Sequence, residues 1–195
     1  VTILDAEQGG CDLLDLDELR LDYSVDEFEN LFMCQFVDDS SSMFPFALMR
    51  RAMVDSWDAW TKDFDPYALR PFGDRPVWIG YDPAESANGD DAALVVIAPP
   101  ERPGGKFRVL EKHRLKGQDF QAQAAFILKQ RERYNVEYIG IDSTGVGAAV
   151  YKLVAAQFIG TERIDYSVPV KTQMVLKAKN VFSSGRIEFD AGAVD

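Results

Sequence analysis

The chain has 195 residues, with 21 basic and 32 acidic side chains and a net charge of −11. Its length suits one domain or one domain with an appendage, and 47% hydrophobic with 27% charged residues excludes wholesale disorder. No apolar run approaches the roughly 18 residues of a membrane-spanning helix. Two cysteines and one histidine cannot make a disulfide framework or a four-ligand zinc site. The net acidity by itself argues against a nucleic acid partner.

The acidity is confined to the first part of the chain. Residues 1–76 contain 17 acidic and 6 basic residues, whereas residues 77–195 contain 15 of each. The stretch Pro66–Pro76 is rich in proline and suits a boundary. We therefore expect an acidic linker or docking segment over residues 1–76 and a separate domain over residues 77–195. The net charge then says little about what the second part binds.

The first segment is expected to form helices and turns without a strand. Ser24 and Glu27 form a capping box before a run of apolar residues at helical spacing, and a second helix is expected over Phe44–Val54. A segment this short and acidic does not close a core alone. We expect it to pack on the second segment or on another partner.

From Val77 onward, short apolar runs alternate with helical patterns, which predicts an α/β fold. The first three strands follow one another closely and should form an antiparallel meander, whereas helix-length connections make the later strands parallel. The result is a mixed sheet flanked by helices. The expected strands are Val77–Tyr81, Ala92–Ala98, Lys106–Arg114, Val136–Ile141, Tyr166–Val170 and Ile187–Phe189, and the expected helices are 119–134, 145–158 and Thr172–Ser183.

Two of these strands are followed by a carboxylate, Asp82 after the first and Asp142 after the fourth. Ligands of open α/β sheets collect beyond the carboxyl ends of the strands. If the two strands are neighbours, the carboxylates lie about 5 Å apart and repel each other. A hard divalent cation, Mg²⁺ or Mn²⁺, is the usual partner of such a pair.

Asp90 and Asp91 end the loop before the second strand and can fold back toward Asp82. A third carboxylate would permit two ions about 4 Å apart, the arrangement used in phosphodiester hydrolysis. A simpler interpretation is also open, because an aspartate at a strand end often only forms a turn and a loop aspartate is often only solvated. Gly145 and Gly147 likewise either cradle a phosphate or permit a turn.

Several motifs together resemble the nuclease domain of the large terminase subunit of tailed bacteriophages. The likeness covers most of the chain and includes the upstream segment that joins the packaging ATPase to the nuclease in that family. The motifs are Trp78–Ala84, Gly89–Val96, Ile139–Gly147, Val168–Lys171, Lys177–Asn180, Gly185–Phe189 and the upstream Asn30–Asp39.

The resemblance implies a ribonuclease H-like fold and a metal-dependent endonuclease that cuts concatemeric viral DNA by two-metal hydrolysis during genome packaging. By position, Asp82 and Asp142 match the first two metal-binding carboxylates, and Asp90 or Asp91 matches a hairpin-loop acid of some members. The implied partners are double-stranded DNA, the viral portal, the small terminase subunit and an upstream ATPase domain. The implied location is the host cytoplasm during virion assembly, without a membrane.

Two features depart from the family pattern. No G-x-x-x-x-G-K-[ST] motif occurs, so the ATPase is not part of this sequence. The family's last catalytic aspartate lies on a helix after the final strand, and only Asp190 and Asp195 are late enough here, outside the expected motif. We therefore expect a nuclease domain truncated at its C-terminus, which cuts DNA weakly on its own.

Two other classes of function remain open, half of an actin-like ATPase and a non-catalytic docking module of a packaging motor. An actin-like ATPase requires a second such domain, which the length does not provide. Basic residues that could follow DNA phosphates form two groups. The first runs along the third strand (Lys106, Arg108, Lys112, Arg114 and Lys116), and the second follows later (Lys171, Lys177 and Lys179).

Overall fold

A computed structural model describes residues 2–11, 13, 15–23, 28, 31–33, 42–84 and 90–193. The chain divides into two compact units, Val1–Phe46 and Ala47–Asp195. Residues 47–75 thus share a unit with the sheet. The change of charge lies later in the chain, at Pro76, and the domain boundary drawn there stays a prediction.

Among its described residues, the first unit contains two short capped helices, α1 (Ile3–Gln8) and α2 (Leu16–Asp22). The hydroxyl of Thr2 accepts a hydrogen bond from the N–H of Asp5 (3.2 Å), and the Asp5 carboxylate accepts one from the N–H of Thr2 (2.8 Å). These two bonds close a capping box, and Asp15 caps α2 with its carboxylate. The helix predicted after Ser24 lies largely outside the described residues.

The second unit is built on one mixed sheet. In the described part of the chain, seven strands take the order β1-β7-β4-β3-β2-β5-β6. Strands β2, β3 and β4 form an antiparallel meander, whereas β5, β6, β7 and β1 pair in parallel, which confirms the predicted mixed sheet. The strands are β1 Met53–Val54, β2 Pro76–Asp82, β3 Ala92–Ala98, β4 Phe107–Leu115, β5 Asn135–Asp142, β6 Thr161–Ile164 and β7 Ile187–Asp190.

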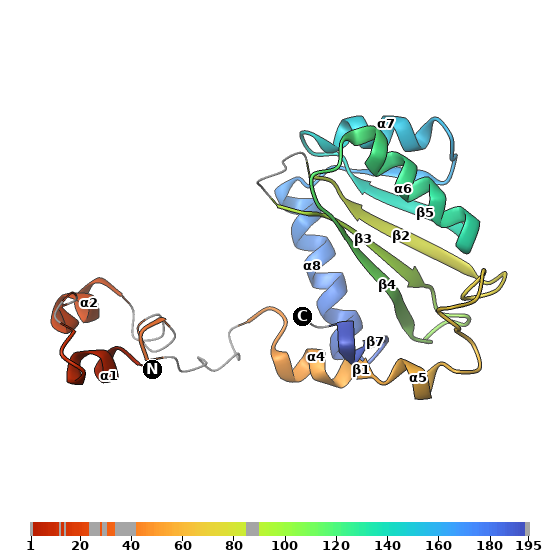
Figure 1. Cartoon of the computed structure of the whole chain (residues 1–195). Helices are drawn as coiled ribbons and strands as arrows, with labels where there is room; N and C mark the ends of the chain where they lie inside the picture. Colours follow the sequence, from red (N-terminus) through yellow and green to blue (C-terminus); the bar gives the residue numbers. More distant parts are fainter. Residues whose placement is uncertain are drawn as a thin grey trace. The chain divides into compact units, whose positions relative to one another are not determined.

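Helices lie on both sides of this sheet (Figure 1). Helices α6 (Phe120–Arg133) and α7 (Gly147–Ala155) pack together over one face, and α8 (Val168–Ser183) crosses from β6 to β7 on the other side. Two short helices, α4 (Phe46–Ala52) and α5 (Ser56–Ala59), precede β2. No helix of the described residues is long and apolar enough to cross a membrane.

Alternation along β2 explains which face is buried. Val77, Ile79 and Tyr81 are buried under α6 and α7, whereas Trp78 and Asp82 point to the opposite, exposed side. The residues of β3 and β5 that share the buried face complete one hydrophobic core. The carboxylate at the end of β2 therefore lies outside this core, on the accessible side.

An ionic network around Glu111 of β4 fixes the position of α6. The Glu111 carboxylate accepts hydrogen bonds from the Arg133 guanidinium (2.9 and 3.1 Å) and the Tyr134 hydroxyl (2.6 Å), and lies 2.9 Å from Nε2 of His113. Burial would raise the pKa of Glu111, but hydrogen bonds from His113 and Tyr134 and the charge of Arg133 lower it overall. The predicted N-cap of α6 is confirmed, because Asp119 accepts from the N–H of Ala122 at 2.7 Å.

The predicted strand Tyr166–Val170 is wrong. Strand β6 lies earlier, at Thr161–Ile164, and Val168 already begins α8. Pro169 occupies the first turn of α8, where its missing N–H removes no helical hydrogen bond. β6 is an edge strand whose two middle side chains are exposed, so it lacks the apolar run by which strands were recognised.

The expectation that the first 76 residues contribute no strand is also wrong. β1 pairs in parallel with β7, with Met53 opposite Phe189 and Val54 opposite Asp190. The helix predicted over Phe44–Val54 ends before β1, at Ala52. A strand of two residues has no alternation to detect, and its partner lies far away in the sequence.

Candidate active site

Two carboxylates end neighbouring central strands. Asp82 is the last residue of β2, and Asp142 is the last residue of β5. Tyr81 lies opposite Ile141 in the parallel β2–β5 pair, so the aspartates that follow leave the sheet side by side. Neighbouring strands are about 4.8 Å apart. The predicted adjacency of the two strand ends is therefore present at the carboxyl edge of the sheet.

The electrostatics of Asp82 reflect this crowding. Partial burial of its carboxyl group raises the pKa of Asp82, and the negative charges of Asp142 and Asp90 raise it further. Asp82 is nevertheless exposed overall, so a ligand can reach it. Among the described residues, neither Asp82 nor Asp142 forms an ion pair with a basic side chain. Such a pair of unneutralised carboxylates is suited to bind a cation.

The turn after β5 holds Asp142 in place. The Asp142 carboxylate accepts a hydrogen bond from the N–H of Thr144 at 2.8 Å, and Gly145 adopts a left-handed φ of 58°. Gly147 then begins α7 in contact with the strand, where a Cβ would lie 1.9 Å from the Asp142 carbonyl oxygen. The N–H of Gly147 donates to the carbonyl of Thr144 (3.3 Å). These contacts favour the turn-forming interpretation of Gly145 and Gly147.

A further set of hydrogen bonds joins β5 to β6 directly after Asp142. Ser143 is only 2% exposed, and its hydroxyl donates to the Asp165 carboxylate at 2.7 Å. The Arg163 guanidinium donates to the Ser143 oxygen (3.0 Å) and pairs with Asp165 (2.9 Å). The hydrogen bonds from Ser143 and Arg163 lower the pKa of Asp165. Asp165 is thus engaged within the protein, whereas Asp142 remains available.

Tyr166 is a residue of this site that sequence reasoning missed. Its N–H donates to the hydroxyl oxygen of Thr144 at 3.1 Å, which fixes it beside the end of β5. Burial raises the pKa of Tyr166, and the charges of Asp142 and Asp82 raise it further. Its phenol therefore lies in the electrostatic field of both carboxylates. No sequence pattern marks this position, because the strand that ends just before it is polar and lacks an apolar run.

Gln123 of α6 is a second residue that sequence reasoning missed. Its side chain is fully buried at 0% exposure, and its Nε2 donates to the carbonyls of Ala84 (2.7 Å) and Gln118 (2.8 Å). The hydroxyl of Tyr81 donates to its Oε1 at 2.8 Å. Gln123 thus contacts residues on both sides of Asp82. A polar residue on the apolar face of a predicted helix was the available signal.

Asp90 and Asp91 are exposed residues immediately before β3. The charge of Asp90 contributes to the raised pKa of Asp82, so Asp90 lies close enough to Asp82 to affect its ionisation. Within the described residues, no three Asp, Glu, His or Cys side chains converge in a metal-binding arrangement. The assignment of Asp90 or Asp91 as a third ligand stays a prediction.

The predicted DNA-contacting lysines lie on two elements. Lys112 is exposed on β4, Lys116 follows the end of that strand, and the other three are exposed on α8. A helix turns about 100° per residue, so Lys171 and Lys179 lie within about 80° of each other and Lys177 projects from another side. The three α8 lysines therefore do not form a single stripe, and their contact with DNA stays a prediction.

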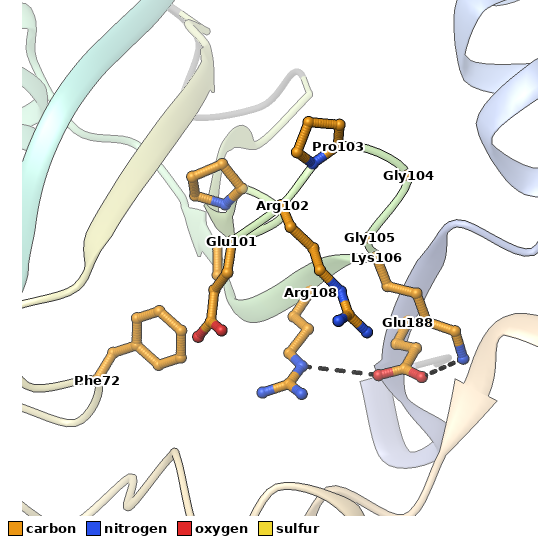
Figure 2. Close-up of a pocket in the computed structure, with 11 residues that line it drawn as sticks. Phe72, Glu101, Arg102, Pro103, Gly104, Gly105, Lys106, Arg108 and Glu188 are labelled. Atoms are coloured by element: carbon orange, nitrogen blue, oxygen red, sulfur yellow. Dashed lines mark hydrogen bonds and ion pairs between the residues drawn. The ribbon is translucent and has the colours of Figure 1, made fainter.

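Charged residues also line a cavity of about 750 Å³ at the opposite end of the sheet, around the turn between β3 and β4. Figure 2 shows Lys106 and Arg108 directed at Glu188 in this cavity, with Arg102 beside them. The Lys106 ammonium lies 2.5 Å and the Arg108 guanidinium 3.7 Å from the Glu188 carboxylate. Neither Asp82 nor Asp142 lines the cavity. Two cations of the predicted basic strand, Lys106 and Arg108, are thus engaged in internal ion pairs.

Asp190, a late candidate for the last catalytic carboxylate, has a structural role. It ends β7 and accepts hydrogen bonds from the N–H groups of Ser56 (3.0 Å) and Gly192 (2.8 Å). Hydrogen bonds from the side chain of Ser56 and from the N–H groups of Ser56 and Gly192 lower the pKa of Asp190. Asp190 thereby joins β7 to the start of α5. The other late candidate, Asp195, lies outside the described residues.

The sequence of the chain is similar to sequences of phage terminases. The family model of the terminase RNaseH-like domain matches residues 79–195, and that of the N-terminal region of T4-like large terminase subunits matches residues 1–51. The terminase ATPase subunit of Escherichia phage P2 is 53% identical over 195 residues, and the probable terminase ATPase subunit of Haemophilus phage HP1 is 44% identical over 200 residues. Both alignments cover 100% of this chain but 32% of the relative, so the chain spans about a third of these proteins' length.

Solved structures share the fold. The large terminase nuclease of thermophilic phage G20c has a TM-score of 0.56 at 19% identity, covering 76% of this chain and 74% of that one. The large terminase of bacteriophage HK97 has a TM-score of 0.53 at 14% identity, covering 79% of this chain and 35% of that one. These similarities confirm the predicted ribonuclease H-like fold. The chain belongs to the terminase RNase H-like domain family of large terminase subunits.

Proposed function

We propose that the sheet unit is a divalent-metal-dependent endonuclease that cuts concatemeric viral DNA during genome packaging. The observation that carries this proposal is the pair Asp82 and Asp142 at adjoining strand ends of a terminase RNase H-like domain. Both side chains leave the sheet at its carboxyl edge, where ligands of such sheets bind. The paired carboxylates are therefore the expected centre of catalysis.

The residues present suit a hard divalent cation. Asp82 and Asp142 offer carboxylate oxygens, and a cation between them would offset the repulsion that contributes to the raised pKa of Asp82. They would hold Mg²⁺ or Mn²⁺, with Asp90 or Asp91 as a ligand of a second ion. When bound, such ions activate water and stabilise negative charge on the phosphate. Structures of the G20c nuclease with magnesium, cobalt and zinc support this assignment.

The chain's own groups hold and orient the reactants. The N–H of Thr144 fixes one oxygen of Asp142, which leaves the other oxygen for a ligand. A tyrosine hydroxyl is protonated at neutral pH, and the raised pKa of Tyr166 keeps it so, which lets it donate a hydrogen bond to a phosphate oxygen beside the two carboxylates. Exposed lysines on β4 and α8 would contact the DNA backbone, which positions the duplex without reading its sequence.

The proposed partners follow from the same family. DNA is the substrate, an ATPase domain precedes the nuclease, and the portal and small terminase subunit are further components in the host cytoplasm. The match of residues 1–51 to an N-terminal terminase model supports the upstream domain. So do the two phage relatives, whose names describe terminase ATPase subunits.

Nicking of supercoiled plasmid in the presence of Mn²⁺ tests the proposal. We expect Asp82→Asn and Asp142→Asn to lower the nicking rate at least about 100-fold, because each removes a carboxylate that would hold the metal ion and, with the ion, its stabilisation of the transition state. Asp190→Asn is the matched control, a strand-end aspartate bound to N–H groups elsewhere, and should retain activity. Unchanged nicking in the Asp82 or Asp142 variant would contradict the assignment. A wild-type chain that never nicks, even when extended at its C-terminus, would favour the docking module.

A further inference from the structure

We infer that Gln123 is a positioning residue of the carboxylate site, which holds Asp82 in place through the residues on either side of it. The inference rests on the proposed function, because it assumes that Asp82 binds a cation. Among the described residues, Gln123 itself forms no hydrogen bond with either carboxylate. Its effect on a bound ion would be transmitted by the backbone of β2 and of the loop that follows.

The amide of Gln123 is saturated by hydrogen bonds to three separate segments. Oε1 accepts from the Tyr81 hydroxyl (2.8 Å), and Nε2 donates to the carbonyls of Ala84 (2.7 Å) and Gln118 (2.8 Å). A buried amide with every polar atom paired has one permitted orientation, which makes it a rigid anchor.

Asp82 needs such an anchor because the strand ladder ends there. The last β2–β3 pair joins Asp82 to Ala93, and the last β2–β5 pair joins Tyr81 to Ile141. Two residues later, the carbonyl of Ala84 is bound by Gln123. Repulsion from Asp142 acts on the carboxylate at this point. Gln123 therefore fixes the chain on the side of Asp82 that the sheet no longer holds.

The same helix provides a matched control. Gln130 follows two turns later and is also buried, at 4% exposure. Its Nε2 donates to the carbonyl of Phe126 within α6 itself (3.3 Å), and its Oε1 has no hydrogen-bond partner among the described residues. Gln130 thus resembles Gln123 in residue type, burial and helix, but among the described residues it binds none of β2 or of the following loop.

The test measures Mn²⁺ binding by titration calorimetry in the full 195-residue chain, together with the melting temperature of each variant. Gln123→Leu keeps the size of the side chain and removes its hydrogen bonds. We expect it to weaken Mn²⁺ binding about tenfold, the lower end of the effect of residues that orient metal ligands. Gln130→Leu should stay within about twofold of wild type. Equal Mn²⁺ affinity of wild type and Gln123→Leu, or an equal loss in Gln130→Leu, would overturn the inference.

Tyr81→Phe keeps the inference testable if Gln123→Leu does not fold. It removes a single hydroxyl and with it the hydrogen bond to Gln123, so Mn²⁺ binding should weaken in the same direction by a smaller factor. Unchanged binding in Tyr81→Phe would then overturn the inference.

Amide hydrogen exchange separates failure of this inference from failure of the proposed function, because it needs no metal. Exchange in the peptide 81–92 should speed up in Gln123→Leu or Tyr81→Phe and not in Gln130→Leu. A wild-type chain that binds no Mn²⁺ would contradict the proposed function alone. Unchanged exchange in both of the first two variants would overturn the role of Gln123.

Discussion

Charged side chains are arranged differently at the two ends of the central sheet. At the end formed by the β3–β4 turn, Glu188 is paired with Lys106 and Arg108, and Arg108 also pairs with Asp63 (3.1 Å). At the carboxyl end of β2 and β5, two carboxylates lie side by side, and among the described residues no cation pairs with either. Paired charge serves the stability of the fold, whereas unpaired like charge is a cost that a ligand can offset.

The pKa values at the two ends move in opposite directions. Burial would raise the pKa of Glu188, but hydrogen bonds from Lys106 and Trp60 and the charges of Lys106 and Arg108 lower it overall. Burial also raises the pKa of Asp82, and there the neighbouring charges raise it further. Burial thus raises the pKa at both ends, but the net shift is downward where the neighbours are cations and upward where they are carboxylates.

The largest loss of stability is expected where α7 packs against the carboxylate end of the sheet. Gly147→Ala places a Cβ 1.9 Å from the Asp142 carbonyl oxygen, so α7 must move away from the strand. We expect a loss of about 3 kcal/mol in the free energy of unfolding, measured by urea denaturation. Gly80→Ala is the control, because its Cβ would meet nothing within 4 Å. Equal stability of the two variants would show that this end is not closely packed.

A smaller effect is expected at the paired end. Glu188→Gln removes the charge that Lys106 and Arg108 share, and should lower stability at pH 7 by about 2 kcal/mol. Because the folded pKa of Glu188 is lowered, its contribution is present above its ordinary value of 4.5 and is lost as the pH falls. Denaturation between pH 7 and pH 3 should therefore show wild type and variant converging in acid. A difference that stays constant with pH would contradict the ion pairs.

Neutralising Asp82 at the carboxylate end should raise the stability of the chain, which is the opposite of the effect expected for Glu188→Gln. Asp82→Asn relieves repulsion from Asp142 and should raise the stability of the metal-free chain at pH 7 by less than about 1 kcal/mol. The folded pKa of Asp82 is raised, so wild type is relatively more stable below its ordinary value of 3.8 and loses that stability as the pH rises. The same denaturation series measures this.

Added Mn²⁺ should reverse the order of stability, because it stabilises only a chain that binds it. A metal-free Asp82→Asn variant that is less stable than wild type would contradict the claim that repulsion between Asp82 and Asp142 destabilises this end of the sheet.

The smallest effect is expected from lysines that belong to neither end. Lys177 and Lys179 of α8 form no ion pair among the described residues, so they are available to DNA phosphates. Replacing either with alanine should reduce the slope of log affinity against log salt concentration by about one. Fluorescence anisotropy of labelled duplex DNA gives this slope, with Lys62→Ala as the control. An unaltered slope would remove these lysines from the DNA interface.

The sequence predicted the carboxyl edge of the sheet because the signals for it are local. The apolar runs before Asp82 and Asp142 mark buried strands, and the helix between them makes those strands parallel, which puts both aspartates at one edge. Asp119 likewise capped α6 as predicted. Each of these inferences needed only a few consecutive residues.

The residues that the sequence did not reveal depend on distant partners. β6 is polar because it lies at an edge, and β1 is a strand only because it pairs with β7. Gln123 gains its role from Tyr81 and Ala84, which lie about forty positions earlier. Tyr166 approaches the carboxylates through a turn whose hydrogen bond to Thr144 spans 22 positions. Apart from the polar side chain of Gln123 on an apolar helix face, none of these long-range contacts leaves a local pattern.

Anomalous scattering from a crystal of this chain soaked in Mn²⁺ would test most directly whether Asp82 and Asp142 share a cation. We expect a manganese peak within ligand distance of both carboxylates in wild type, and no peak there in Asp142→Asn. A wild-type crystal with no peak between Asp82 and Asp142, or with manganese bound only elsewhere, would contradict the proposed metal site and with it the nuclease assignment.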